Sequence, residues 1–223
     1  MLLFFKKYRL FFGVMFVLSA IIITLFYQAL KPKKTLPIFS PSDVNPELVD
    51  STMQHVSGNK HRIADFAFVN QNGDTITQKN YENKIYVADF FFTTCQTICP
   101  IMTDNMVKIQ EQIKNNPKVM LLSHSVTPDI DSVPVLKAYA LKKGVIDSKW
   151  NLVTGDKKDI YGIARKSYLA VKTENASELY DMVHTENFIL VDSKRRIRGF
   201  YDGTKDEDMI KLIADINWLS QNE

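Results

Sequence analysis

The chain has 223 residues, of which 45% are hydrophobic and 24% are charged, so a packed core is possible and wholesale disorder is excluded. Its formal net charge of +3 is unevenly distributed, because six basic residues and no acidic residue occur before residue 35. The rest of the chain carries the other 22 of the 28 basic residues against all 25 acidic residues, and is mildly acidic. No basic stripe with interleaved aromatic residues occurs, so the sequence gives no support for nucleic-acid binding.

The first segment, residues 1–30, contains 21 consecutive uncharged residues, LFFGVMFVLSAIIITLFYQAL, at positions 10–30. As a helix, this run would cross a hydrocarbon core about 30 Å thick. A cleaved secretory signal has a shorter apolar region, of about 7–15 residues, and ends at a small-x-small site that is not evident here. No cysteine lies near the run, which excludes lipoprotein processing. We therefore expect residues 1–30 to be an uncleaved signal anchor that spans the membrane once.

Basic residues flank both ends of this run. The short basic N-terminus before a single span favours an N-terminus inside the cell and a soluble domain outside the cytoplasm. A mitochondrial transit peptide would be amphipathic and richer in Arg and Ser. We therefore expect a single-pass protein of the bacterial cytoplasmic (inner) membrane, whose soluble domain faces the periplasm or the outside.

Residues 31–60 contain four of the eight prolines and little periodic hydrophobicity, which is typical of a linker. We expect this linker to be followed by one folded domain at residues 61–223. No internal repeat or low-complexity tract interrupts that domain.

Strand patterns begin the predicted domain. Residues 64–78, ADFAFVNQNGDTITQ, alternate apolar and polar residues around Asn72-Gly73, and predict a hairpin whose two turn residues both have positive φ. Residues 84–93, KIYVADFFFT, form a continuous apolar run, which is typical of a strand buried on both faces.

The later segments alternate between helix and strand. Residues 118–126, KVMLLSHSV, predict another buried strand, and residues 188–201 predict a second hairpin. Helical spacing occurs at 102–116, 131–144, 156–168 and 205–221, and Gly144 is expected to end the second of these helices. This alternation around buried central strands predicts an α/β sandwich.

The only two cysteines, Cys95 and Cys99, lie in FFFTTCQTICPIM at the junction between the buried strand and the next helix. Three interpretations are open, and a structural disulfide is the least favoured of them. The five-residue ring closed by such a disulfide would stabilise the folded state by about 2 kcal/mol through loop-closure entropy, whereas a hundred-residue loop would give about 4.7 kcal/mol.

A redox interpretation is favoured by the helix N-terminus, whose unpaired N–H groups and macrodipole stabilise a thiolate. Pro100 suits the first helical turn, because its missing N–H would have had no partner there. However, exchange proteins usually have a C-x-x-C spacing, whereas three residues separate Cys95 from Cys99.

A metal site is the third interpretation. A spacing of four places both sulfurs on the same side of one helical turn. Two thiolates suit Cu(I), and an added imidazole gives a ligand set that Cu(II) also tolerates, whereas structural zinc would want four protein ligands. Because the chain has two cysteines, such a site needs a histidine.

The chain contains four histidines. His55 and His61 lie in the linker or at its end, where a solvated role is expected. His124 lies in a predicted strand and is expected to be a hydrogen-bonded structural residue. His184 immediately precedes the apolar strand of the second hairpin, and a loop there can point back at the cysteine loop. His184 is therefore the candidate third ligand.

Other residues near the cysteines have structural interpretations. Asp129 and Asp131 are expected to cap the helix that follows them rather than to bind metal. Met102 and Met106 carry soft sulfur donors, but their helical spacing favours packing in the core.

Four ordered segments resemble the Sco (SenC-type) family, thioredoxin-like copper-binding proteins that are tethered to respiratory membranes. FFTTCQTICPIM resembles the family's C-x-x-x-C-P motif, and SHSVTPDIDSVPVLKAYA resembles its segment after the central strand, with Thr127 in place of an aspartate. WNLVTGD resembles a W-x-x-L-T-G stretch, with Val153 in place of leucine. VHTENFILVD resembles the family's histidine segment and places His184 on the metal-binding histidine. The resemblance extends from about residue 60 to the C-terminus.

The resemblance implies a thioredoxin-like sandwich with an N-terminal β-hairpin extension, preceded by a single transmembrane helix. It also implies a copper site, for Cu(I) or Cu(II), made by Cys95, Cys99 and His184. The implied role is maturation of the dinuclear copper centre of cytochrome c oxidase, by copper delivery, by reduction of the target cysteines, or by both. The implied partners are the copper-site subunit of that oxidase or another copper chaperone.

The leading hypothesis is therefore a membrane-anchored copper metallochaperone rather than an enzyme. The alternative is a thiol–disulfide oxidoreductase that uses Cys95 and Cys99 without metal and does not need His184. A peroxidase is less favoured, because the sequence places no arginine beside the cysteines.

Overall fold

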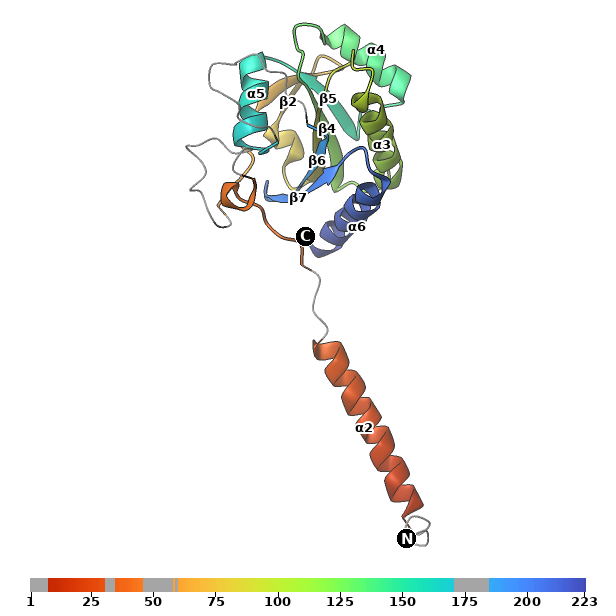
Figure 1. Cartoon of the computed structure of the whole chain (residues 1–223). Coiled ribbons are helices and arrows are strands. Elements are labelled where there is room, and N and C mark those ends of the chain that lie inside the picture. The colour runs from red at the N-terminus through yellow and green to blue at the C-terminus, as the bar shows by residue number, and fades with distance from the viewer. Residues whose placement is uncertain (1–7, 31–34, 46–57, 59, 171–184) are drawn as a thin grey trace. The chain divides into compact units, whose positions relative to one another are not determined.

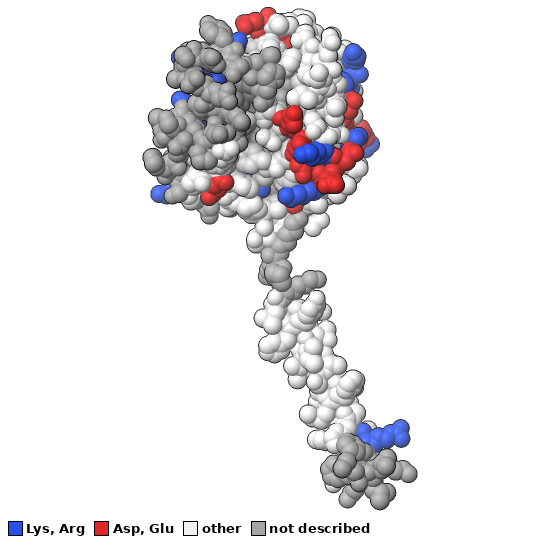
Figure 2. All heavy atoms as spheres, viewed as in Figure 1, with Lys and Arg blue, Asp and Glu red and all other residues white. Residues whose placement is uncertain are grey.

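The computed structural model describes residues 8–30, 35–45, 58, 60–170 and 185–223. The chain divides into two compact units, residues 1–35 and 36–223. The first unit contains helix α2, Arg9–Leu30 (Figure 1), the one helix among the described residues that is long and apolar enough to cross a membrane. Beyond Arg9 this helix carries no charged side chain, and its surface is white in Figure 2.

The second unit is built around one seven-stranded sheet with the strand order β2-β1-β5-β4-β3-β6-β7. The pairs β3–β4 and β4–β5 are parallel, and the other neighbouring pairs are antiparallel. The strands are β1 (Ala67–Asn70), β2 (Thr75–Thr77), β3 (Ile85–Phe91), β4 (Val119–Ser125), β5 (Trp150–Thr154), β6 (Asn187–Val191) and β7 (Ile197–Asp202). The helices are α3 (Ile98–Ile113), α4 (Val133–Lys143), α5 (Lys157–Lys166) and α6 (Asp206–Asn222), with short 3₁₀ helices η1 (Pro41–Asp43) and η3 (Gln78–Tyr81).

Strand β3 is the centre of this arrangement, because all seven of its residues are buried. Val87 and Phe91 belong to a core that α3, α4 and α6 cover, whereas Ala88 and Phe90 belong to a second core on the side of α5. Figure 1 shows α5 across the sheet from α3 and α6. The predicted α/β sandwich is confirmed, and the continuous apolar run in the sequence is a strand with two buried faces.

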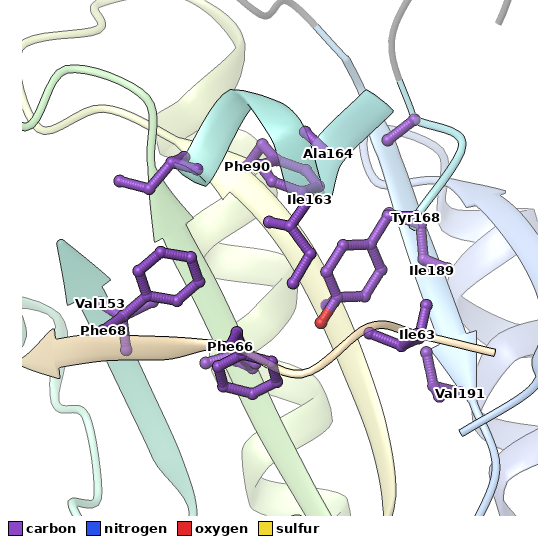
Figure 3. Packing of buried hydrophobic residues seen from close by; sticks show 14 of the residues in the cluster. Ile63, Phe66, Phe68, Phe90, Val153, Ile163, Ala164, Tyr168, Ile189 and Val191 are labelled. Carbon is purple, nitrogen blue, oxygen red and sulfur yellow. The ribbon is translucent and has the colours of Figure 1, made fainter. Parts of the chain in front are cut away.

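The core on the side of α5 is rich in aromatic rings (Figure 3). Phe66 and Phe68 stack with their ring centroids 5.7 Å apart. Tyr168, which follows α5, is fully buried, and its hydroxyl lies 3.2 Å from the hydroxyl of Tyr86 in β3. The hairpin β1–β2 and the end of helix α5 therefore pack against the same face of the sheet through these rings.

His124 lies in the same core, with its ring stacked on Phe90 at 4.9 Å between centroids. Its Nδ1 lies 3.3 Å from the carbonyl oxygen of Asp89, so Nδ1 carries the proton and donates. Burial lowers the pKa of His124 to about 4, and the ring is neutral at physiological pH. The predicted structural, hydrogen-bonded role of His124 is confirmed.

Both predicted hairpins are present, as β1–β2 and β6–β7, and β1 pairs with β5. The first turn differs from the prediction, because Gly73 has a positive φ of 84° but Asn72 does not. Asn70 explains the difference: its Oδ1 accepts hydrogen bonds from the backbone N–H groups of Asn72 and Asp74, both at 2.9 Å. A side chain therefore holds a wider turn, which needs a single left-handed residue.

His61 is buried, so the predicted solvated role for this residue is wrong. Its Nε2 lies 2.7 Å from the carbonyl oxygen of Ser167, which follows helix α5. Burial lowers the pKa of His61, although the hydrogen bond to Ser167 opposes that shift. The contact joins positions that are 106 residues apart, so no local pattern could have indicated it.

Residues 36–45, within the predicted linker, contact the sheet. The backbone N–H of Phe39 donates to the carbonyl oxygen of Ile197 at 2.9 Å, which adds a short bridge to the edge strand β7. The ring of Phe39 also lies edge-on to that of Phe200, with 5.4 Å between centroids. Covering part of an edge strand in this way protects it from pairing with another chain.

A buried ion cluster holds the same segment. The guanidinium of Arg198 donates to the carbonyl oxygens of Leu36 and Pro37, both at 2.9 Å. It also donates to the carboxylate of Asp192 at 2.9 Å and to that of Glu223 at 2.7 Å. Arg198 is 6% exposed and Asp192 is fully buried. Arg196 also pairs with Asp192 at 2.7 Å and with Glu223 at 3.2 Å, so removing Arg198 would leave two carboxylates with one cation.

We expect Arg198→Ala to lower the free energy of unfolding by about 1.5–3 kcal/mol, because Asp192 and Glu223 would each lose a buried partner and would share Arg196. Urea denaturation of the two proteins measures this change. The matched control is Lys114→Ala, which breaks an exposed ion pair with Glu111 and should alter stability far less. Equal effects of the two substitutions would contradict the importance of the buried cluster.

Candidate functional site

The cysteine loop lies where strand β3 ends at Phe91 and helix α3 begins at Ile98, as the sequence predicted. Cys95 is partly exposed, Cys99 is 3% exposed, and both are free thiols. Thr97, the residue before α3, makes no side-chain cap. Instead, the backbone N–H of Cys99 donates to Cys95 Sγ at 3.4 Å, so this sulfur serves as the acceptor at the helix N-terminus.

The two thiols have opposite pKa shifts. Burial by itself raises the pKa of Cys95, but hydrogen bonds from the Cys99 thiol and from the backbone N–H groups of Thr97 and Cys99 outweigh it and lower the pKa to about 7. Burial raises the pKa of Cys99 to about 12, and the hydrogen bond between its thiol and Cys95 adds to that shift. Near neutral pH the pair therefore contains a partly exposed thiolate beside a buried thiol. Such a pair can attack a disulfide or, after losing one more proton, bind a soft metal ion.

We expect iodoacetamide to modify Cys95 with a rate that rises through a midpoint near pH 7, because the thiolate is the reactive form. Cys99 should resist modification over the same range, and Cys99→Ala should move the Cys95 midpoint upward by removing a hydrogen-bond donor. Mass spectrometry of the alkylated peptides follows each site. A Cys95 midpoint close to the ordinary value of 9 would contradict the hydrogen-bonded arrangement.

Asp131 does not cap helix α4, and neither does Asp129, so that prediction is wrong. The cap position is occupied by Ser132, without a side-chain hydrogen bond. Asp131 is fully buried and accepts hydrogen bonds from the backbone N–H and the hydroxyl of Thr93. The hydroxyls of Ser125 and Thr127 also donate to it, at 2.6 and 3.0 Å. The carboxylate therefore joins the start of the cysteine loop to the loop that follows β4.

Asp89 is a second buried acid near the cysteines, and the sequence analysis did not select it. Burial raises the pKa of Asp89 to about 7, although a hydrogen bond from the Ser123 hydroxyl opposes the shift. That hydroxyl in turn accepts a hydrogen bond from Trp150 Nε1 at 2.8 Å. Asp89 Oδ1 has no partner among the described residues, and the Asp89 charge contributes to the raised pKa of Cys99. The signal in the sequence was a single acid within the apolar run 84–93.

We expect Asp89→Asn to make the stability of the protein less dependent on pH. Because the pKa of Asp89 is higher in the folded state, about 7, than its ordinary value of 3.8, the wild type loses stability as the pH rises between these values. The variant should therefore gain roughly 2–4 kcal/mol relative to the wild type between pH 4 and pH 8. Urea denaturation across this range measures the difference. A difference in the free energy of unfolding between variant and wild type that stays constant from pH 4 to pH 8 would show that Asp89 does not titrate in this range.

The candidate ligand His184 lies outside the described residues, so the structure brings together two members of the predicted set, Cys95 and Cys99. Among the described residues, no group of three His, Cys, Asp or Glu side chains could hold a metal ion. Met102 and Met106 are fully buried in the core beside α3, which confirms their predicted packing role.

The SCO1/SenC family model matches residues 54–221. The chain belongs to the SCO1/SenC family. Among curated relatives, it is 30% identical to a SCO1 protein homolog of Bacillus subtilis (strain 168), over 72% of this chain and 83% of the relative.

Solved structures of Sco proteins share the fold. A SCO1/SenC family lipoprotein from Bacillus anthracis is 33% identical, with a TM-score of 0.64 over 72% of this chain and 95% of that one. BsSco, described as a member of the Sco family of cytochrome c oxidase assembly proteins with a disulfide switch, is 29% identical, with a TM-score of 0.63 over 73% and 95%. Arabidopsis thaliana ScoI with copper bound is 26% identical, with a TM-score of 0.57 over 72% and 98%. The α/β sandwich of this family member is therefore the thioredoxin-like fold of Sco proteins.

Proposed function

We propose that this chain is a membrane-anchored copper metallochaperone for the dinuclear copper centre of cytochrome c oxidase. Membership of the SCO1/SenC family carries the proposal. The copper-bound relative from Arabidopsis and the oxidase assembly role of the family of BsSco support it. Cys95, Cys99 and His184 are the proposed ligands, and Cu(I) or Cu(II) is the cargo.

The chemistry of the two cysteines fits copper. Thiolates are soft ligands that suit Cu(I), and Cys95 reaches the thiolate form near neutral pH. Cys99 holds its proton in the metal-free protein, so copper binding would release that proton and would be favoured at higher pH. The partly exposed position of Cys95 leaves an approach for the thiolates of a partner protein.

The topology supports His184 as the third ligand. Strand β6 is antiparallel to β3, with Ala88 opposite Ile189, so β6 begins at the edge of the sheet where β3 ends. Thr185, which lies two residues before β6, directly follows His184 in the sequence. An imidazole at this position would convert a two-sulfur site into a mixed set that also accepts Cu(II).

The redox state of the cysteines would control copper loading. When the two thiols form a disulfide, they lose two protons and pass two electrons to an acceptor such as a partner disulfide. Both sulfur ligands are then unavailable. The reduced pair can accept copper, and the thiolates of the copper-site subunit of the oxidase, or of another copper chaperone, can exchange with it one ligand at a time.

Residues 1–30 are the proposed membrane anchor, and residues 61–223 the copper-binding domain. The length and apolar surface of helix α2 support this assignment. We propose a single pass through the bacterial cytoplasmic membrane, with the domain on the periplasmic or outer side, because a short basic N-terminus favours the inside.

Anaerobic copper titration of the reduced full chain in detergent tests this function. We expect one tightly bound Cu(I) per chain, and a loss of at least about a hundredfold in affinity for Cys95→Ala and for Cys99→Ala, since each removes a ligand. His184→Ala should weaken Cu(II) binding more than Cu(I) binding, because the imidazole is the harder donor.

His55→Ala is the matched control, as it removes a histidine outside the proposed ligand set and should leave both affinities unchanged. Equal losses of Cu(I) and Cu(II) affinity in His184→Ala would contradict its assigned role. The absence of any tight site in the wild type would overturn the chaperone function.

A thiol–disulfide oxidoreductase is the second candidate, and the opposite pKa shifts of Cys95 and Cys99 favour it. The Cys95 thiolate would attack a target disulfide, form a mixed disulfide and release one target thiolate. Cys99, after losing its proton, would then attack Cys95 and release the second, so that the target gains two electrons. This function predicts rapid thiol–disulfide exchange with a target disulfide in the absence of copper, and the same exchange rate in His184→Ala.

A further inference from the structure

Asp131 is fully buried, yet no ion pair joins it to a basic side chain of the described residues. Four neutral donors on three residues satisfy its two oxygens: the N–H and hydroxyl of Thr93, and the hydroxyls of Ser125 and Thr127. A carboxylate out of water needs such hydrogen bonds, so its position is strongly determined by these partners.

Thr93 connects this carboxylate to the cysteine turn. It lies two residues after β3 and two residues before Cys95. The backbone N–H of Cys95 donates to the carbonyl oxygen of Phe92 at 3.3 Å, which closes a turn around Thr93. Cys95 Sγ then accepts the N–H of Cys99 at 3.4 Å. A continuous series of contacts therefore runs from Asp131 to the sulfur of Cys95 and on to the start of α3.

Ser125 and Thr127 lie on the other side of the carboxylate. Ser125 is the last residue of β4 and pairs with Phe91, so its position is set by the sheet. The N–H of Val126 donates to the carbonyl oxygen of Phe91 at 2.9 Å, which extends that pairing by one residue. Asp131 thus ties the cysteine turn to a part of the molecule that cannot move without breaking the central strand pair.

We propose that Asp131 is a positioning residue that sets the dithiol–disulfide equilibrium of Cys95 and Cys99, an inference that rests on the proposed function for its consequence in copper loading. A thiol held beside its partner has a higher effective concentration than one on a loose loop. That concentration determines how far the pair is oxidised by a given redox buffer. Asp131 therefore fixes the fraction of the protein in which both sulfurs are free to bind copper.

The test equilibrates the full chain in detergent, without copper, with mixtures of glutathione and glutathione disulfide. In this exchange two protein thiols and one glutathione disulfide give one protein disulfide and two glutathiones. The oxidised fraction is read by mass shift after alkylation of the remaining thiols. Near-ultraviolet circular dichroism shows whether each variant keeps its tertiary packing.

We expect Asp131→Asn and Thr93→Val to lower the equilibrium constant for disulfide formation by at least about tenfold, which is about 30 mV for a two-electron couple. Ser125→Ala and Thr127→Val are the matched controls. Each removes one donor to the same carboxylate but leaves the contact with Thr93, so each should lower thermal stability while shifting the equilibrium by less than about threefold.

An unchanged equilibrium in folded Asp131→Asn, or equal shifts in the controls, would overturn the proposal, since either result means that Asp131 acts through stability alone. If Asp131→Asn fails to fold, Thr93→Val decides by itself, and no shift in that variant overturns the proposal. The assay contains no copper, so its outcome is independent of the copper titration. A wild type without a copper site would refute the chaperone function and leave the positioning role standing.

Discussion

Burial of strand β3 on both faces is the constraint on which the rest of the domain depends. The strand pairs in parallel with β4 from Ile85 and Val119 to Phe91 and Ser125, and antiparallel with β6 on its other side. Two separate cores can then form, one beneath α3, α4 and α6 and one beneath α5. Because both neighbours of β3 fix its direction, its carboxyl end delivers the cysteine loop to a defined place on the sheet edge. Loops supported by a rigid scaffold in this way are where binding and catalytic residues concentrate.

Two buried acids lie near that loop, and the number of hydrogen-bond donors around each determines what it can do. Asp131 has four neutral donors, so its charge is satisfied and the residue can act as a fixed attachment for the cysteine turn. Asp89 has the Ser123 hydroxyl, but one of its oxygens has no partner among the described residues, so burial raises its pKa. Its charge also helps to hold the proton on Cys99. An aspartate therefore has a positioning role at Asp131 and an electrostatic role at Asp89.

Local patterns in the sequence were sufficient to predict the elements that frame the site. The apolar run 84–93 predicted β3, and the helical spacing of Met102 and Met106 predicted the buried face of α3. Together they placed Cys95 and Cys99 at a strand-to-helix junction, where the structure has them. These predictions succeed because strand and helix periodicity depend on neighbours within a few residues. Even so, the turn at Gly73 was predicted with two left-handed residues and has one, because the Asn70 side chain takes over part of the turn.

The residues whose roles were wrongly predicted from the sequence, His61 and Asp131, make their contacts with partners far along the chain. His61 meets Ser167 across 106 residues, and Asp131 meets Thr93 across 38 residues. Neither contact leaves a periodic signal, and His184 lies outside the described residues, so its place as a ligand stays a prediction. The sequence by itself determined the helices, the position of the cysteines and every strand except β5 (Trp150–Thr154), because those elements depend on short-range propensity and patterning. Only the tertiary structure decided which buried polar groups are satisfied and by which donors, because that depends on how distant segments pack together.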